Sequence, residues 1–194
     1  HYVRIKADNR MEADGPLRGT FTLTAEGQSD SNIRRIFTTG FQSEWKSTME
    51  RQLLAISPKA RLLSVDYGKN PKDYQAAPIK ITFRYEIPDY ALKGEGEMFF
   101  RPMVMNNLYN QVRSYMWIDT SVENRKYGFK DACSRLVELD ETVQLPAGYK
   151  LVSAVKDETM QGVGADFEGS LVQKGNIVLL HNRMALKKRV YEAC

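Results

Sequence analysis

The sequence has few of the residues that catalysis and metal binding usually require. Its 194 residues include two cysteines, Cys133 and Cys194, and two histidines, His1 and His181. Nucleophilic catalysis needs a nucleophile, a base within hydrogen-bond reach and a group that orients the base. No glycine-rich loop or catalytic motif accompanies these residues, so we expect no enzyme, no cofactor and no metal. The two thiols are expected to be unrelated, since pairing cannot be deduced from sequence.

Long apolar runs and dense basic stretches are also missing. No run approaches the roughly 18 apolar residues of a membrane span, so none is expected. The net charge is only +4, and the densest basic spots are Arg34-Arg35 and Lys187–Arg189. Nucleic-acid binding predicts a basic stripe with interleaved aromatic residues, which is not seen, so these cations are interpreted as solvated surface. The chain begins at His1 within strand-like sequence, which predicts a piece of a longer protein.

What is present is an ordinary globular composition, with 42% hydrophobic and 27% charged residues. A chain of this length buries roughly two thirds of its unfolded surface and needs no disulfide to fold. Near the N-terminus, Val3 and Ile5 alternate with polar residues, as Phe21 and Leu23 do after Asp14–Pro16. Period-two alternation around a Gly-Pro turn predicts a β-hairpin over residues 1–27.

The period changes to that of a helix after Gly27. Two apolar sets at spacings of three and four predict two helices: Ile33, Ile36 and Phe37, then Trp45, Met49, Leu53 and Ile56. Asp30 or Ser31 is the expected N-cap of the first helix. Gly40 is expected to separate the helices and Pro58 to end the second.

The remaining chain returns to strand periodicity. The clearest strand covers residues 79–87, with five apolar residues on one face and polar residues on the other. Further strands are expected at 60–68, 94–102, 136–145, 149–155, 165–175 and 176–191. A tight corner is expected at Leu145–Tyr149 and a turn at Gly175-Asn176.

This order of elements predicts a mostly β protein of the α+β class. We expect antiparallel sheets or a β-sandwich with a two-helix layer packed on one face. Residues 1–100 contain the hairpin, the helices and antiparallel strands. Residues 101–194 form a sandwich-like part, with one continuous domain as the alternative.

An irregular, aromatic segment is the candidate ligand site. Tyr109, Tyr115, Trp117 and Tyr127 lie near several asparagines. Aromatic rings beside amides suit carbohydrate contacts, although the same rings also suit core packing. The chain is therefore also compatible with an extracellular carbohydrate- or peptide-binding module.

Two further residue sets bear on the function. Cys133 and His181 are the only candidates for a stand-alone thiol hydrolase, and no motif supports the pair. Glu141 shares a predicted strand face with Val137, Leu139 and Val143. Because an unpaired buried charge is costly, we expect Glu141 to form a structural salt bridge or to lie at a bulge.

The order of elements, together with three short motifs, resembles a known family. Asp14–Gly19 is similar to a "G-x-l-x-G" hairpin, Ser31–Ile56 to a helix with arginine pairs, and Leu145, Pro146, Gly148 and Tyr149 to "LP-x-G-Y". Together they resemble the C-terminal β-rich region that follows the transglutaminase-like core of bacterial exported proteins. That family's Cys-His-Asp set belongs to the core, and no motif here matches it.

The resemblance implies a non-catalytic accessory or interaction module. Its expected partner is the upstream domain of the same polypeptide, and its expected location is the periplasm or the cell exterior. A glycan or a peptide is the alternative partner.

Overall fold

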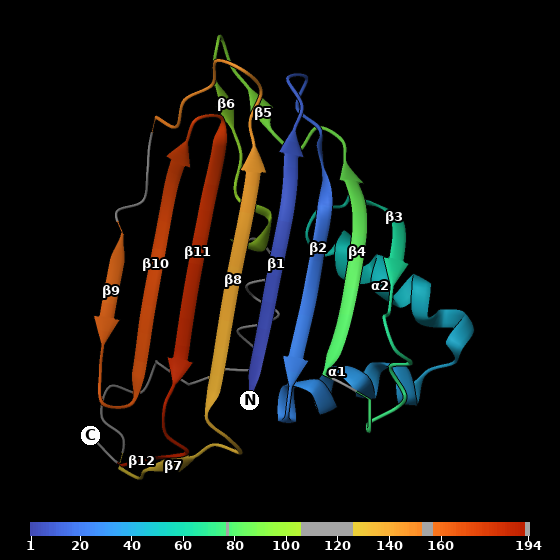
Figure 1. Cartoon of the computed structure of the whole chain (residues 1–194), viewed down its shortest axis with the longest axis vertical. Coiled ribbons are helices and arrows are strands. Elements are labelled where there is room, and N and C mark those ends of the chain that lie inside the picture. Colours follow the sequence, from blue (N-terminus) through green and yellow to red (C-terminus); the bar gives the residue numbers. More distant parts are fainter. Residues whose placement is uncertain (77, 106–125, 153–156, 193–194) are drawn as a thin grey trace.

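A large mixed sheet forms the centre of the protein. The computed structural model describes residues 1–76, 78–105, 126–152 and 157–192. The eight-stranded sheet has the order β3-β4-β2-β1-β8-β11-β10-β9 (Figure 1). Its strands are β1 (Tyr2–Met11), β2 (Leu17–Glu26), β3 (Arg61–Asp66), β4 (Ile79–Ile87), β8 (Arg135–Gln144), β9 (Glu158–Gln161), β10 (Ala165–Lys174) and β11 (Ile177–Leu186). Neighbours are antiparallel except β1 and β8, which are parallel.

The remaining elements are short. Two two-stranded sheets pair β5 (Leu92–Lys93) with β6 (Met98–Phe99), and β7 (Phe129–Lys130) with β12 (Val190–Tyr191). The helical elements are α1 (Gln28–Thr39), η1 (Gln42–Glu44), α2 (Trp45–Leu54) and η2 (Met103–Met105). The predicted fold class, mostly β with a two-helix layer, is confirmed. Because β1 pairs with β8, strands from residues 1–100 and 101–194 lie side by side in one sheet.

The two faces of this sheet differ sharply. In β1, the odd-numbered residues from Val3 to Met11 are buried, and the even-numbered residues from Arg4 to Arg10 are exposed. β4 alternates in the same way. We call the buried side the covered face and the opposite side the open face. This alternation is what a strand produces when only one side of its sheet is packed.

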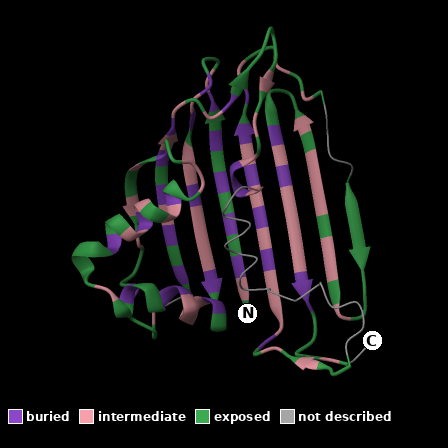
Figure 2. Cartoon of the chain, turned by 180° about the vertical axis from the view of Figure 1, so that it is seen from behind, coloured by how far each residue is buried: buried purple, intermediate pink, exposed green. Residues whose placement is uncertain are grey.

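The helices pack on the covered face over the β1-β2-β4-β3 half (Figure 2). Ile33 and Phe37 of α1, with Trp45, Met49 and Leu53 of α2, join the core, as the helical spacing predicts. Two details of the prediction are wrong. Ile36 is 38% exposed. Neither Asp30 nor Ser31 is the N-cap, because α1 starts after Gly27, whose φ of 68° suits a residue without a Cβ.

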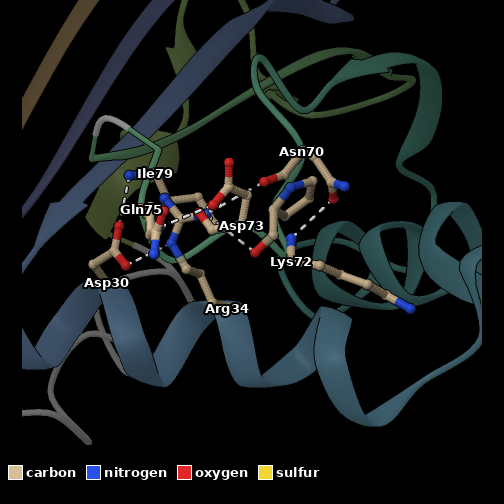
Figure 3. Close-up of polar contacts among 8 residues, drawn as sticks. Asp30, Arg34, Asn70, Lys72, Asp73, Gln75 and Ile79 are labelled. Atoms are coloured by element: carbon tan, nitrogen blue, oxygen red, sulfur yellow. Dashed lines mark hydrogen bonds and ion pairs between the residues drawn. The ribbon is translucent and has the colours of Figure 1, made fainter.

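Arg34 of α1 ties the β3–β4 connection to the helix (Figure 3). Its Nε donates to Asp30 Oδ2 at 2.6 Å, and its Nη1 donates to the carbonyls of Pro71 and Asp73 at 3.1 and 2.8 Å. Asp30 Oδ1 in turn accepts from the backbone N–H of Ile79 at 2.7 Å. The interpretation of Arg34 as solvated surface is therefore wrong, since it is 2% exposed and fully engaged in structure.

The segment after β8 also departs from expectation. The corner at Leu145–Tyr149 is present, with Gly148 at a φ of 88°, but residues 149–152 form no strand. Instead, the Gln173 side chain of β10 accepts from Leu151 N–H at 2.6 Å and donates to the Tyr149 carbonyl at 3.0 Å. A side-chain amide thus satisfies backbone groups that a neighbouring strand would otherwise bind. Residues 153–155 of the expected strand lie outside the described residues.

Candidate functional site

A chain of buried polar side chains crosses the covered face beneath β2. The Tyr85 hydroxyl of β4 donates to Asn9 Oδ1 of β1. Asn9 Nδ2 donates to Glu141 Oε1 of β8 at 2.7 Å, and the Val104 N–H of η2 donates to Glu141 Oε2 at 3.0 Å. Tyr85, Asn9 and Glu141 are at most 5% exposed. The chain links three strands and fastens η2 to the sheet.

Gly19 makes this crossing possible. It lies on β2 directly between Asn9 and Tyr85 in the register. A Cβ built on Gly19 would lie 2.0 Å from Asn9 Oδ1 and 2.4 Å from the Asp8 carbonyl oxygen. The missing side chain therefore leaves the space in which the tyrosine hydroxyl and the asparagine amide meet.

The network corrects the prediction for Glu141. No bulge interrupts the pairing of β8 with β1 or β11. Among the described residues, no arginine or lysine pairs with Glu141. Its carboxylate is satisfied by an amide and by backbone N–H groups instead. Burial raises the pKa of Glu141, while the hydrogen bonds from Val104, Met103 and Asn9 act in the opposite direction.

Stability is expected to depend on pH through this carboxyl group. Because its folded pKa lies above the unfolded value, its contribution is fully present below the unfolded pKa of about 4.3 and is lost as pH rises through the folded pKa. Tyr85, the other titratable member, has a pKa raised well above its usual value by burial and by Glu141. Chemical unfolding of wild type and Glu141→Gln from pH 7 to pH 5 should show wild type gaining stability relative to the variant as pH falls. A constant difference would contradict this assignment.

The open face carries cross-strand polar pairs. Arg4 pairs with Glu138, and His181 Nδ1 lies 2.6 Å from Asp140 Oδ1. Thr22 and Thr82 share a hydroxyl hydrogen bond of 3.1 Å between β2 and β4. Such pairs each stabilise a sheet by roughly 0.2–1 kcal/mol. Figure 1 views this face, with the helices behind the strands.

A shallow depression of about 700 Å³ runs across the strands on the open face. We call it the transverse groove. It is lined by residues of six neighbouring strands, among them Leu63 (β3), Arg84 (β4), Arg18 (β2), Arg10 (β1), Gln144 (β8) and Ile177 (β11). Asp8 of β1 also lines it and is the one carboxylate among the lining residues. Its centre is therefore cationic, and each end is apolar.

An apolar patch adjoins the Ile177 end of the groove. Val172 and Ile177 are each 37% exposed, and Leu179 is partly exposed. Val172 is the Cα partner of Leu179 across β10 and β11, and all three side chains belong to the open face. Among the described elements, the main contacts of β10 and β11 are with each other and with the neighbouring strands β8 and β9. The patch lies beside the β10–β11 turn. Contiguous exposed apolar residues mark an interaction surface more often than isolated ones do.

The candidate ligand residues are only partly placed. Tyr109, Tyr115 and Trp117 lie outside the described residues. Tyr127 is 74% exposed, and its ring lies 5.5 Å from Lys126 Nζ. Of the four candidate residues, the structure therefore describes Tyr127 alone.

Cys133 and His181 are not brought together. Cys133 is buried ahead of β8, and His181 stands opposite Asp140 on the open face. Cys133 precedes Arg135, the first residue of β8, whereas His181 lies beside Asp140, five residues further along this strand. At a strand rise of about 3.4 Å per residue, the distance along β8 from Arg135 to Asp140 is about 17 Å. Cys194 lies outside the described residues.

The described residues contain neither a candidate metal cluster nor a candidate membrane-spanning helix. They contain no group of three or more His, Cys, Asp or Glu side chains arranged to hold a metal ion. None of their helices is both long enough and apolar enough to cross a membrane.

Sequence reasoning missed the arginines of the groove and the role of Arg34. Asp30 and Arg34 are four residues apart on one helix, a spacing that signals an ion pair. For Arg10, Arg18 and Arg84, each outward position was readable from the alternation. Their proximity depends on the register of β1, β2 and β4, which the sequence does not state.

One comparison with known proteins gives a match. A family model described as a domain of unknown function with a solved structure (DUF3858) matches residues 96–193, half of the chain. No curated protein and no solved structure is detectably similar to this chain. The matched region contains β8 to β11, and so the apolar patch and the Gln144 and Ile177 end of the groove.

Proposed function

Because the chain belongs to the DUF3858 family of domains of unknown function, we propose that it is a non-catalytic module that docks on a neighbouring domain through the open face of its sheet. The neighbour would be the upstream, transglutaminase-like domain of one exported polypeptide, in the periplasm or outside the cell. The resemblance of the hairpin and the LPxGY corner supports this partner and this location.

The observation that carries the proposal is the asymmetry of the sheet. One face is closed by α1, α2 and η2, and the other bears an apolar patch with polar surroundings. A stably folded monomer gains nothing from placing Val172, Ile177 and Leu179 toward water. A partner that covers them gains roughly 25 cal/mol per Å² of apolar surface removed from water.

The separation of Cys133 from His181 supports a non-catalytic role. The remaining histidine, His1, accepts a hydrogen bond at Nδ1 from Gln28 N–H at 2.7 Å and so serves as a cap next to α1. His181 faces Ser170 across β10 and β11, but its Nδ1 is taken by Asp140, and among the described residues no hydrogen bond joins Ser170 to His181.

Calorimetry with the separately expressed transglutaminase-like neighbour tests the proposal. We expect binding with a negative heat-capacity change, since apolar area is buried. Ile177→Lys should weaken binding about tenfold or more, because it places a charge in the centre of the contact. Val163→Lys is the matched control, as Val163 is 79% exposed in the β9–β10 turn, off the patch. Equal affinity for the two variants, or no heat with wild type, would contradict the proposal.

A further inference from the structure

We infer that the transverse groove binds an extended, acidic peptide segment, whose carboxylates lie against Arg84, Arg18 and Arg10. This inference rests on the proposed function and specifies the chemistry of the partner: the segment belongs to the neighbouring domain. Three features of the groove support it, namely its length, its charge and the character of its two ends.

The groove has the length of a short extended peptide. From β3 to β11 it crosses five strand spacings. At about 4.8 Å per spacing this is about 24 Å, which about seven residues of extended chain cover. A single small anion would contact only the centre and leave both ends unused.

The charge at the centre favours carboxylates. Arg18 already pairs with Glu86 at 3.2 Å, and Arg10 lies 3.4 Å from Glu12. Arg84 differs, because its exposed guanidinium makes no ion pair or hydrogen bond with any residue in the described part of the chain. Its neighbours across the sheet are Thr20 and Ser64, which carry no charge.

A guanidinium in this position can take a carboxylate through two parallel N–H···O bonds. Asp8 lies two residues from Arg10 on the same strand face and lowers the positive charge on the β1 side. Glu86 lies two residues from Arg84 on the same face of β4 and is paired with Arg18, so the cation of the groove without an ion pair in the described part of the chain is Arg84.

The ends of the groove favour apolar side chains. Leu63 is 51% exposed at the bulge in β3, and Ile177 is 37% exposed at the other end. An occupant with acidic residues at its centre and apolar residues toward its ends therefore matches the groove along its whole length. Continuity of Ile177 with the apolar patch places this segment at the edge of the larger docking surface.

The test uses a fluorescently labelled short peptide of alternating glutamate and valine, with glutamine–valine and lysine–valine peptides of the same length. Anisotropy should show binding of the glutamate peptide that weakens with added salt. The other two peptides should bind at least about tenfold less tightly. Arg84→Glu should reduce affinity for the glutamate peptide by a similar factor.

Lys6→Glu is the matched control, because Lys6 is an exposed cation on the same face of β1 that does not line the groove. Affinity that is the same for the three peptides, or equal losses in Arg84→Glu and Lys6→Glu, would overturn the inference. So would the absence of binding to the wild-type protein.

The two proposals fail in different ways. One outcome is that the neighbouring domain binds with an affinity that Ile177→Lys lowers and Arg84→Glu leaves unchanged. In that case docking through the open face stands and the acidic-segment inference is overturned. If the glutamate peptide binds as expected but the neighbouring domain does not bind at all, the groove is an acidic-peptide site and the choice of the neighbouring domain as its source is overturned.

Discussion

Replacing Arg34 with alanine is expected to lower the free energy of unfolding by about 3–5 kcal/mol, the range for breaking a buried ion pair from one side. The substitution leaves Asp30 without its cation and leaves the carbonyls of Pro71 and Asp73 without their donor. It also removes the stem that fills the space between α1 and the β3–β4 connection. Urea unfolding followed by circular dichroism measures the loss.

The neighbouring arginine provides the control. Arg35 is exposed and makes one hydrogen bond to the Asn32 side chain, at 3.4 Å. Arg35→Ala is expected to change stability by no more than about 0.5 kcal/mol. Arg34→Lys should recover only part of the loss, because an ammonium cannot reach Asp30 and several carbonyls in the geometry of the guanidinium fork. Similar stability of Arg34→Ala and Arg35→Ala would show that the buried cluster contributes little.

Replacing Gly19 with alanine is expected to destabilise the fold by roughly 3 kcal/mol, the upper part of the range for overpacking a core. The added Cβ would meet Asn9 Oδ1 at 2.0 Å and the Asp8 carbonyl at 2.4 Å. The side-chain amide can move aside only by giving up its bonds to Tyr85 and Glu141. The backbone carbonyl can move only by opening the β1–β2 pairing.

Gly40→Ala is the matched glycine control. Its backbone has a φ of −107°, and the nearest atoms to a new Cβ are the Ile36 carbonyl at 3.4 Å and Glu44 Oε2 at 3.8 Å. Because alanine fits without strain and restricts the unfolded chain, we expect Gly40→Ala to be neutral or slightly stabilising. Thermal unfolding of both variants checks the pair. A Gly19→Ala protein as stable as Gly40→Ala would mean that the Asn9–Tyr85 crossing does not depend on the glycine.

Substitutions on the two sides of the sheet are expected to affect different properties. Those at Arg34 and Gly19 should lower stability, and those at Ile177 and Arg84 should weaken binding. Arg34 and Gly19 act on the covered face and at the loop that closes it, whereas Ile177 and Arg84 act on the open face. Ile177→Lys and Arg84→Glu are therefore expected to leave the unfolding midpoint nearly unchanged while altering association. This separation follows from a sheet in which only one side is packed.

Much of the secondary structure could be read from the alternation of apolar and polar residues. Ile79 to Ile87 alternate strictly, and β4 covers these residues. Trp45, Met49 and Leu53 recur at helical spacing, and all three are buried in α2. The prediction was wrong for residues 149–152, where Gln173 replaces a strand partner. Local periodicity contains no information about a side chain that arrives from another strand.

The amino-acid sequence by itself determined which side of each strand turns toward the core, because a strand places successive side chains on opposite faces. It therefore also determined that Arg10, Arg18 and Arg84 face water, and that Tyr85 and Glu141 face inward. Tertiary structure alone decided which of these residues meet. Register aligns Asn9, Gly19 and Tyr85 in one row, and the parallel pairing of β1 with β8 brings Glu141 to Asn9 from 132 residues away. The groove and the buried polar chain both arise from that pairing, because contacts between distant strands are fixed by the whole sheet and not by any local segment.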